Sequence, residues 1–254
     1  MWNAFISLMV NILLYIYDFV GNNFGIAIIL FTILVRLVTY PLNAQQVKQT
    51  KAMQDLQGSK KWQEIQKKYK DNKEKLAQEQ MKIYQEMGVS PFGSCLPTLI
   101  QFPIIIGLYQ AIIRALAVTP LQLLNLSKHI NDGASLIPLN NMFLWMDLSL
   151  PEKDFGLSIA GFGIPILAII VVVTSYLQTK LMTPPSTNPG DQTAQMSRAM
   201  GLYMPIFMGW LAYSFSSGLA LYFVVSNLTT ILQYGIMGRL DWSNVLPKQL
   251  KRNN

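Results

Sequence analysis

Apolar runs long enough to cross a membrane recur along this chain, and they constrain its fold more than any other feature. The first clear run is FGIAIILFTILVRLVTYPLNAQQ, residues 24–46, which carries the charged residue Arg36 well inside it. A helix needs about 20 residues to cross a hydrocarbon core of roughly 30 Å. Hydrophobic residues make up 51% of the 254 residues and charged residues only 13%. The sequence therefore predicts an all-α integral membrane protein.

The order of apolar and polar segments predicts a bundle of five transmembrane helices. In chain order the segments are an interfacial amphipathic helix 1–22, a first span 23–42, a cytoplasmic helical hairpin 43–92, a second span 93–116, an extracytoplasmic loop 117–154, a third span 155–182, a cytoplasmic loop 183–198, a fourth span 199–216, a fifth span 217–238 and a cytoplasmic tail 239–254. For the first segment, a spanning helix or an uncleaved signal anchor is the alternative. Within the extracytoplasmic loop, MFLWMDLSLP (142–151) is expected to form a turn of interfacial helix.

The distribution of basic residues predicts the orientation of these spans. Ten of the twenty Lys and Arg residues lie between residues 43 and 92, whereas the loop 117–154 has an acidic excess. Cytoplasmic loops of membrane proteins are enriched in Lys and Arg. We therefore expect the N-terminus outside and the C-terminus in the cytoplasm, and no direct nucleic-acid partner. The hairpin should bury a thin apolar seam that includes Trp62 and Ile83, and its basic surface could bind a partner or anionic lipid headgroups.

Polar residues on several predicted spans fall on single helical faces. The members of each set are three or four residues apart, and such positions share one face of a helix. The sets are Thr32, Arg36, Thr39, Asn43 and Gln46; Thr98 and Gln101; Thr174 and Gln178; and Tyr222, Ser226, Thr230 and Gln233. Facing one another, they would enclose a hydrophilic cavity within the bilayer. Residues 24–31 are almost wholly apolar, so the cavity should open to the cytoplasm and be closed outside.

The alternative for Arg36 is an orientation anchor whose side chain extends to the headgroups. The aligned polar faces favour the cavity, because a lone anchor needs no polar residues on the neighbouring spans. The predicted spans contain no Asp or Glu, so hydroxyl groups, amides and water are expected to solvate the guanidinium.

The sequence offers no conventional catalytic or metal-binding pattern. Its one cysteine, Cys95, and one histidine, His129, exclude a disulfide framework and make Cys/His metal sites unexpected. We therefore expect no catalytic residue, no metal, no cofactor and no enzymatic activity. A small secondary transporter or channel is the main alternative function, and it would require inverted repeats and a path to both faces. An intramembrane enzyme is the second alternative, although no convincing base lies beside a serine.

Three segments, in this order and spacing, resemble the YidC/Oxa/Alb membrane protein insertase family. They are NFGIAIILFTILVRLVTYPLNAQQ (23–46), PFGSCLPTLIQFPIIIGLYQAI (91–112) and FSSGLALYFVVSNLTTILQ (215–233). The resemblance implies a bacterial YidC-like member of the short form, without a large extracytoplasmic domain. The resemblance implies a five-helix core with a cytoplasm-facing hydrophilic groove.

The resemblance also implies roles for individual residues. Arg36 matches the family's groove arginine, and Gln101 and Gln178 match polar positions on groove-lining helices. Tyr222 and Phe223 match an aromatic pair that contacts the apolar segment of the substrate.

The function implied is that of an insertase or chaperone in a bacterial plasma membrane. It would move short polar segments of nascent membrane proteins through the groove and release their apolar helices into lipid. Nascent membrane proteins and the lipid bilayer are the expected partners. The ribosome, the signal recognition particle receptor and a Sec translocon are further candidates.

Overall fold

The computed structural model describes residues 2–69, 72–88, 96–116, 140–154, 157–159, 162–182 and 192–238. In these ranges the protein is helical apart from short strand pairs, which confirms the all-α fold class. The chain divides into two compact units. We call them the bundle unit, which comprises residues 1–37, 104–183 and 199–254, and the hairpin unit, which comprises residues 38–103 and 184–198.

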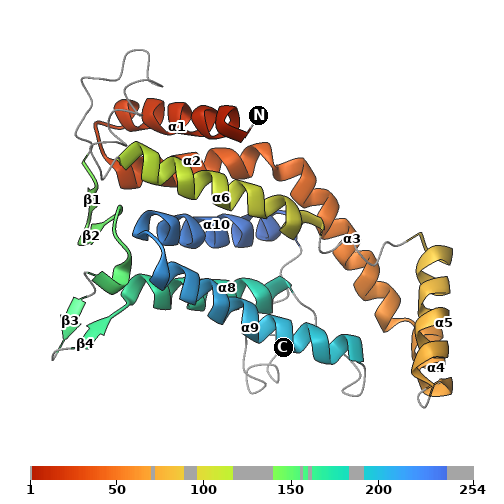
Figure 1. Cartoon of the computed structure of the whole chain (residues 1–254). Coiled ribbons are helices and arrows are strands. Elements are labelled where there is room, and N and C mark those ends of the chain that lie inside the picture. The colour runs from red at the N-terminus through yellow and green to blue at the C-terminus, as the bar shows by residue number, and fades with distance from the viewer. Residues whose placement is uncertain are drawn as a thin grey trace, which may run out of the picture. The chain divides into compact units, whose positions relative to one another are not determined.

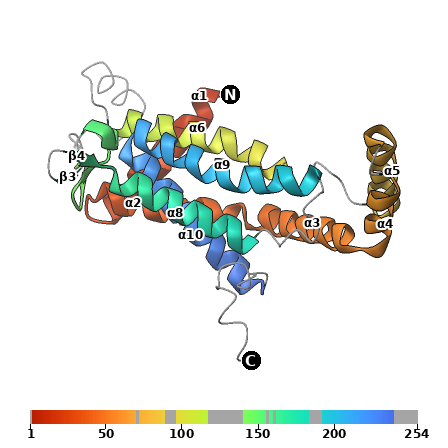
Figure 2. The ribbon, with the colours of Figure 1, turned by 90° about the horizontal axis from the view of Figure 1, so that it is seen from below.

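Among the described residues, six helices lie wholly or partly in the bundle unit, and Figure 1 shows their arrangement. They are α1 (Trp2–Phe19), α2 (Phe24–Val38), α6 (Leu96–Leu116), α8 (Ile166–Met182), α9 (Gln192–Ser214) and α10 (Ser217–Ile236). Figures 1 and 2 both show α8 and α9 side by side. Gly209 permits this approach, since a Cβ atom there would lie 2.2 Å from a methyl carbon of Val172. Small residues serve this purpose in many membrane helix pairs.

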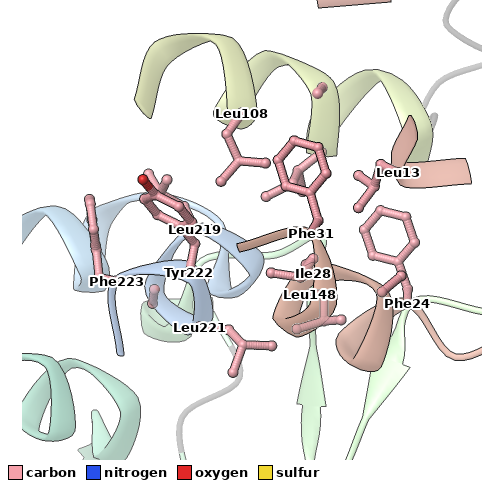
Figure 3. Close-up of a cluster of buried hydrophobic side chains, with 14 of the residues drawn as sticks. Leu13, Phe24, Ile28, Phe31, Leu108, Leu148, Leu219, Leu221, Tyr222 and Phe223 are labelled. Carbon is pink, nitrogen blue, oxygen red and sulfur yellow. The ribbon is translucent and has the colours of Figure 1, made fainter. Parts of the chain in front are cut away.

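A single apolar cluster joins the helices of the bundle unit (Figure 3). Ile28 and Phe31 of α2, Leu108 of α6 and Leu219 of α10 are all buried in it. Leu13 brings α1 into the same cluster. The apolar faces predicted from the sequence therefore meet, and the polar side chains of α2 and α10 are left to pair with each other.

The segment after residue 140 differs from its prediction. MFLWMDLSLP was expected to form a turn of helix, and this expectation was wrong: β1 (Met142–Phe143) pairs with β2 (Met146–Asp147) in an antiparallel hairpin. The carboxylate of Asp147 accepts hydrogen bonds from Ser149 N at 2.9 Å and Asn141 Nδ2 at 3.0 Å. These local bonds favour a turn over a helix, because Asp competes with the backbone for hydrogen bonds.

The third span was predicted to begin at residue 155, but its helix, α8, begins only at Ile166. A second antiparallel pair, β3 (Leu157–Ile159) with β4 (Phe162–Ile164), precedes α8. Pro165 stands directly before α8, and its carbonyl accepts the first helical hydrogen bond, from Ile169 N at 3.0 Å. A proline is compatible with the start of a helix and not with its interior, so the helix cannot extend back to residue 155 undisturbed.

Length and composition identify some, not all, of the predicted spans among the described residues. Helices α1 and α10 are each long and apolar enough to cross a membrane, and α2 with its successor α3 would make a third span if counted together. The stretch 102–114 of α6 and helix α8 are apolar but shorter. Three points stay predictions: the count of five spans, the segment boundaries, and whether α1 lies at the interface or spans the membrane. Residues 117–139, 183–191 and 239–254 of the predicted loops and tail lie outside the described residues.

The hairpin unit has a small core of its own. Its helices are α3 (Tyr40–Gly58), α4 (Lys60–Lys68) and α5 (Lys73–Glu86). Leu56, Trp62 and Ile83 are buried together, so the structure brings Trp62 and Ile83 into contact as the apolar spacing predicts. Ser59 and Asn72 cap α4 and α5, because their side chains accept hydrogen bonds from backbone N–H groups in the first turn. On the exposed surface, Lys82 donates to Glu79, and this hydrogen bond raises the pKa of Lys82.

The buried indole should hold the hairpin together, whereas an exposed ion pair should contribute little. Trp62→Ala is expected to destabilise the packing of α4 on α5 by about 3–5 kcal/mol, since it leaves a large cavity in a small core. Lys61→Ala removes the neighbouring Lys61–Glu86 pair, 2.5 Å long and more than half exposed, and should cost at most about 1 kcal/mol. Hydrogen exchange along α5 in the full chain measures both effects. Equal exchange in the two variants would contradict this account of the hairpin.

Candidate functional site

The guanidinium of Arg36 is held inside the bundle unit by α10. Arg36 lies in the last turn of α2, and its Nε donates to Ser226 Oγ at 3.0 Å. A terminal guanidinium nitrogen donates to the same hydroxyl oxygen. Ser226 is buried and Arg36 half-buried. Hydrogen bonds to an ionised group are stronger than neutral ones, so this contact is a strong polar link between α2 and α10.

A second residue of α10, Gln233, contacts the backbone of Arg36. Gln233 Nε2 donates to the carbonyl oxygen of Arg36 at 3.2 Å. Helix α2 ends at Val38 and α3 begins at Tyr40 with Pro41 in its first turn, and carbonyls in the last turn of a helix lack intrahelical partners. Gln233 therefore links α10 to the backbone of the last turn of α2.

These two contacts show which way the Arg36 side chain extends. Ser226 and Gln233 are seven residues apart, which corresponds to about 10 Å along α10. The guanidinium thus points back from its own carbonyl toward the beginning of α10, as helical side chains tend to tilt toward the helix N-terminus. If α2 ends at the cytoplasmic face, as the sequence predicts, a side chain that extended to the headgroups on that side would point the other way.

A second polar cluster joins α8 to α10. Asn227 Nδ2 donates to Ser175 Oγ at 2.8 Å and to Thr174 Oγ1 at 3.2 Å. Asn227 directly follows Ser226, so α10 has polar contacts on two sides, with α2 and with α8. Sequence reasoning noted Thr174 but missed Ser175. The signal was available, because Ser175 is adjacent to Thr174 and the pair directly follows an apolar run, residues 166–173.

Some threonines of the predicted polar faces satisfy their hydroxyl groups within their own helix. Thr32 Oγ1 donates to Ile28 O at 2.6 Å, and Thr230 Oγ1 donates to Ser226 O at 2.7 Å. Thr32 is fully buried, and back-bonding of this kind is common for Ser and Thr in helices. The structure therefore places Thr32 in the packed core beside Phe31, one turn away from the Arg36 contact.

The predicted aromatic pair is also buried in this structure. Tyr222 and Phe223 are 1% and 5% exposed, and their ring centroids are 5.8 Å apart in a tilted arrangement. Figure 3 shows both on α10 among the apolar side chains of the core. Direct contact with a substrate would need their neighbours to move.

The remaining predicted residues are distributed over other parts of the chain. Gln178 is half-buried on α8 of the bundle unit, whereas Thr39 and Asn43 belong to the hairpin unit and are half-buried there. The Asn43 Nδ2 atom is buried without a hydrogen-bond partner among the described residues. The side chains of Gln46 and Gln101 lie outside the described residues. Of the predicted groove residues, the structure thus brings Arg36 and Ser226 into direct contact.

The described part of the chain offers no obvious metal site. Within it, no group of three or more His, Cys, Asp or Glu side chains is arranged to hold a metal ion. The contacts around Arg36, Ser226 and Asn227 can supply neutral hydrogen-bonding groups and the positive charge of the Arg36 guanidinium.

Comparisons with known proteins give consistent results. A family model described as 60Kd inner membrane protein matches residues 15–242. The membrane protein insertase YidC of Oceanobacillus iheyensis is 38% identical over 219 residues, which cover 84% of this chain and 73% of that protein. The membrane protein insertase MisCA of Bacillus subtilis is 36% identical over 237 residues, which cover 91% of this chain and 77% of that protein.

A solved structure shares the fold. The crystal structure of an active YidC insertase, with its first transmembrane domain resolved, matches with a TM-score of 0.62 and 27% identity. The match covers 92% of this chain and 46% of the crystallised one. The chain therefore spans less than half the length of that protein.

The Arg36–Ser226 contact should be measurable as an energetic coupling. In a double-mutant cycle, Arg36→Met and Ser226→Ala should couple by about 1.5–3 kcal/mol, the range for hydrogen bonds to charged groups. The measurement is thermal unfolding of the purified chain in detergent. Arg36→Met with Ser175→Ala is the matched control, because Ser175 contacts Asn227, and it should be close to additive. Additivity in both cycles would mean that the Arg36–Ser226 contact contributes nothing to stability.

Proposed function

Because the chain belongs to the 60Kd inner membrane protein family, we propose that it acts as a membrane protein insertase. Its substrates are nascent membrane proteins with a short polar segment that must cross the bilayer. The chain resides in a bacterial plasma membrane as five spans, with its N-terminus outside and its C-terminus in the cytoplasm. The positive-inside distribution of Lys and Arg supports this orientation.

The observation that carries the proposal is the inward-pointing guanidinium of Arg36 on Ser226. A charge among apolar helices is costly in a membrane, and such residues mark working sites more often than structural ones. Here the charge is held by a neutral hydroxyl group and not by a carboxylate of the predicted spans, since these contain no Asp or Glu. The positive charge of Arg36 would attract a polar or acidic segment that enters the groove.

The groove lowers the barrier for the polar segment. Each backbone group that loses its water in hydrocarbon without a partner costs several kcal/mol. Hydroxyl and amide groups of Arg36's neighbours replace that water, so the segment can pass part of the bilayer while still hydrogen-bonded. The proposed lining residues in the bundle unit are Arg36, Gln178 and Ser226.

The apolar segment that follows then moves into lipid. Burial of each CH₂ group provides about 0.8 kcal/mol, and a membrane potential assists an acidic tail by about 2.3 kcal/mol per charge and 100 mV. Tyr222 and Phe223 contact this segment once α10 and its neighbours separate. No nucleotide, cofactor or covalent step is required, and nascent chains are the only partner that the mechanism needs.

Removal of the guanidinium should reduce insertion strongly. Arg36→Ala and Arg36→Glu are expected to lower insertion of a single-span substrate into liposomes by about tenfold or more, the equivalent of one charged hydrogen bond. Arg36→Lys should retain most activity, since the positive charge is kept. Arg114→Gln is the control for loss of a positive charge elsewhere in the bundle unit. Full activity of Arg36→Glu would refute the proposed role of Arg36, and small-solute flux without insertion would instead favour a transporter or channel.

Crosslinking can test which face of α8 meets the substrate. A photo-reactive residue at Gln178 should crosslink a stalled nascent membrane protein, because Gln178 is a proposed lining residue. The same probe at Val173, which is 57% exposed on a different face of α8, should crosslink it several-fold less and should label lipid instead. A preference of the nascent chain for position 173 would place the substrate path outside the polar groove.

A further inference from the structure

The segment 140–154 inserts apolar side chains into one end of the bundle unit. Met146 and Leu148 are buried in the same core as Ile28 and Leu219, and Figure 3 draws Leu148 within this cluster. Figure 1 shows the strands of this region at the end of the bundle where α2, α8 and α10 begin. The segment therefore covers that end as part of the core.

Backbone hydrogen bonds attach the segment to the start of α10. Ser217 N donates to Leu150 O at 2.9 Å, and Gly218 N donates to Leu148 O at 3.0 Å. The Ser217 hydroxyl group adds a second bond to Leu150 O at 2.9 Å. The first N–H groups of a helix have no intrahelical partner, so the segment serves as the N-terminal cap of α10.

The same segment contacts α1 and α2. Asn140 N donates to the Tyr17 hydroxyl oxygen at 2.9 Å. Phe143 packs so closely on the start of α2 that a Cβ atom at Gly25 would lie 2.1 Å from its ring. The segment is thus attached to two further helices of the bundle unit.

A buried carboxylate attaches the segment to α8. Glu152 is 2% exposed, and its two carboxylate oxygens accept hydrogen bonds from Leu167 N at 2.7 Å and Ala168 N at 2.8 Å. These are N–H groups of the first turn of α8, where the helix dipole favours a negative charge. Both oxygens are satisfied in this position, and moving the segment away would leave a buried charge and two N–H groups without partners.

We propose that residues 140–154 form a plug that seals this end of the bundle, and that Glu152 is the positioning residue that holds the plug in place. Because one short segment caps both α8 and α10, loosening it at Glu152 also loosens it at Ser217 and Gly218. The plug keeps ions and small solutes from crossing while polar segments use the part of the bundle around Arg36. Ser226 lies nine residues beyond Ser217, about 14 Å along α10, so the seal and the Arg36 contact are separate structures.

The test uses the full-length chain in liposomes without a substrate. Glu152→Ala should speed hydrogen exchange of the Leu167 and Ala168 amides by about tenfold, since they lose their acceptor, and also that of Ser217 and Gly218, since the loosened segment no longer holds the Leu150 and Leu148 carbonyls in place. Leakage of trapped ions and of a small dye should rise several-fold above the wild-type value. Asp154→Ala is the matched control: Asp154 is on the same 3-10 turn, Glu152–Asp154, but is exposed, and this variant should behave as wild type.

The outcomes are distinct. If exchange rises only at Leu167 and Ala168 and the vesicles stay tight, Glu152 merely caps α8 and the plug proposal is overturned. The same conclusion follows if Asp154→Ala leaks as much as Glu152→Ala. Should Glu152→Ala fail to fold, Glu152→Gln replaces it, because the amide offers one acceptor oxygen to two N–H groups, and the same readings decide. Leakage is measured without substrate, so a failure of the insertase proposal would not affect this result.

Discussion

A guanidinium held among apolar helices is the constraint on which the arrangement of the bundle depends. The charge of Arg36 needs polar neighbours, and in a membrane only other helices, enclosed water or the headgroups can supply them. Helix α10 provides Ser226 for the guanidinium and Gln233 for the backbone carbonyl. With Asn227 it also reaches Ser175 of α8. Helix α10 therefore has a fixed rotation relative to α2 and α8, because turning it would break polar contacts on both sides.

Buried Glu152 and half-buried Arg36 are satisfied in different ways. Glu152 is held by backbone N–H groups, which cannot turn away without unwinding the first turn of α8. Arg36 is held by the side chain of Ser226, which can exchange one hydrogen-bond partner for another. Fixed donors suit a closed end, and exchangeable ones suit a surface that must accept a changing series of polar groups. The difference in partner type thus matches the proposed division between plug and groove.

Periodicity predicted much of this arrangement, and tertiary contacts decided the rest. The three- and four-residue spacing identified the faces of Arg36 and Ser226, because polar residues are conspicuous in apolar helices. Spacing could not reveal that Thr32 bonds to its own helix, since back-bonding depends on the side-chain rotamer. Apolar composition likewise did not separate the strands at 142–147 from a helix. In the sequence, Glu152 could not be told apart from an exposed acidic residue of a loop. Its burial depends on where α8 begins, which the sequence did not reveal.

The burial of Tyr222 and Phe223 bears on how a substrate could leave the groove. Both lie on α10 between its capped start at Ser217 and its contact with α2 at Gln233, so α10 is held at both ends. The polar contact nearest the pair is that of Ser226 and Asn227 with α2 and α8. An entering polar segment offers its own donors and acceptors to these residues, and exchanging hydrogen bonds costs little when each broken bond is replaced by one of the same kind. Competition at this contact would loosen the middle of α10 while its ends stay fixed, which would uncover the aromatic pair only when a polar segment already occupies the groove.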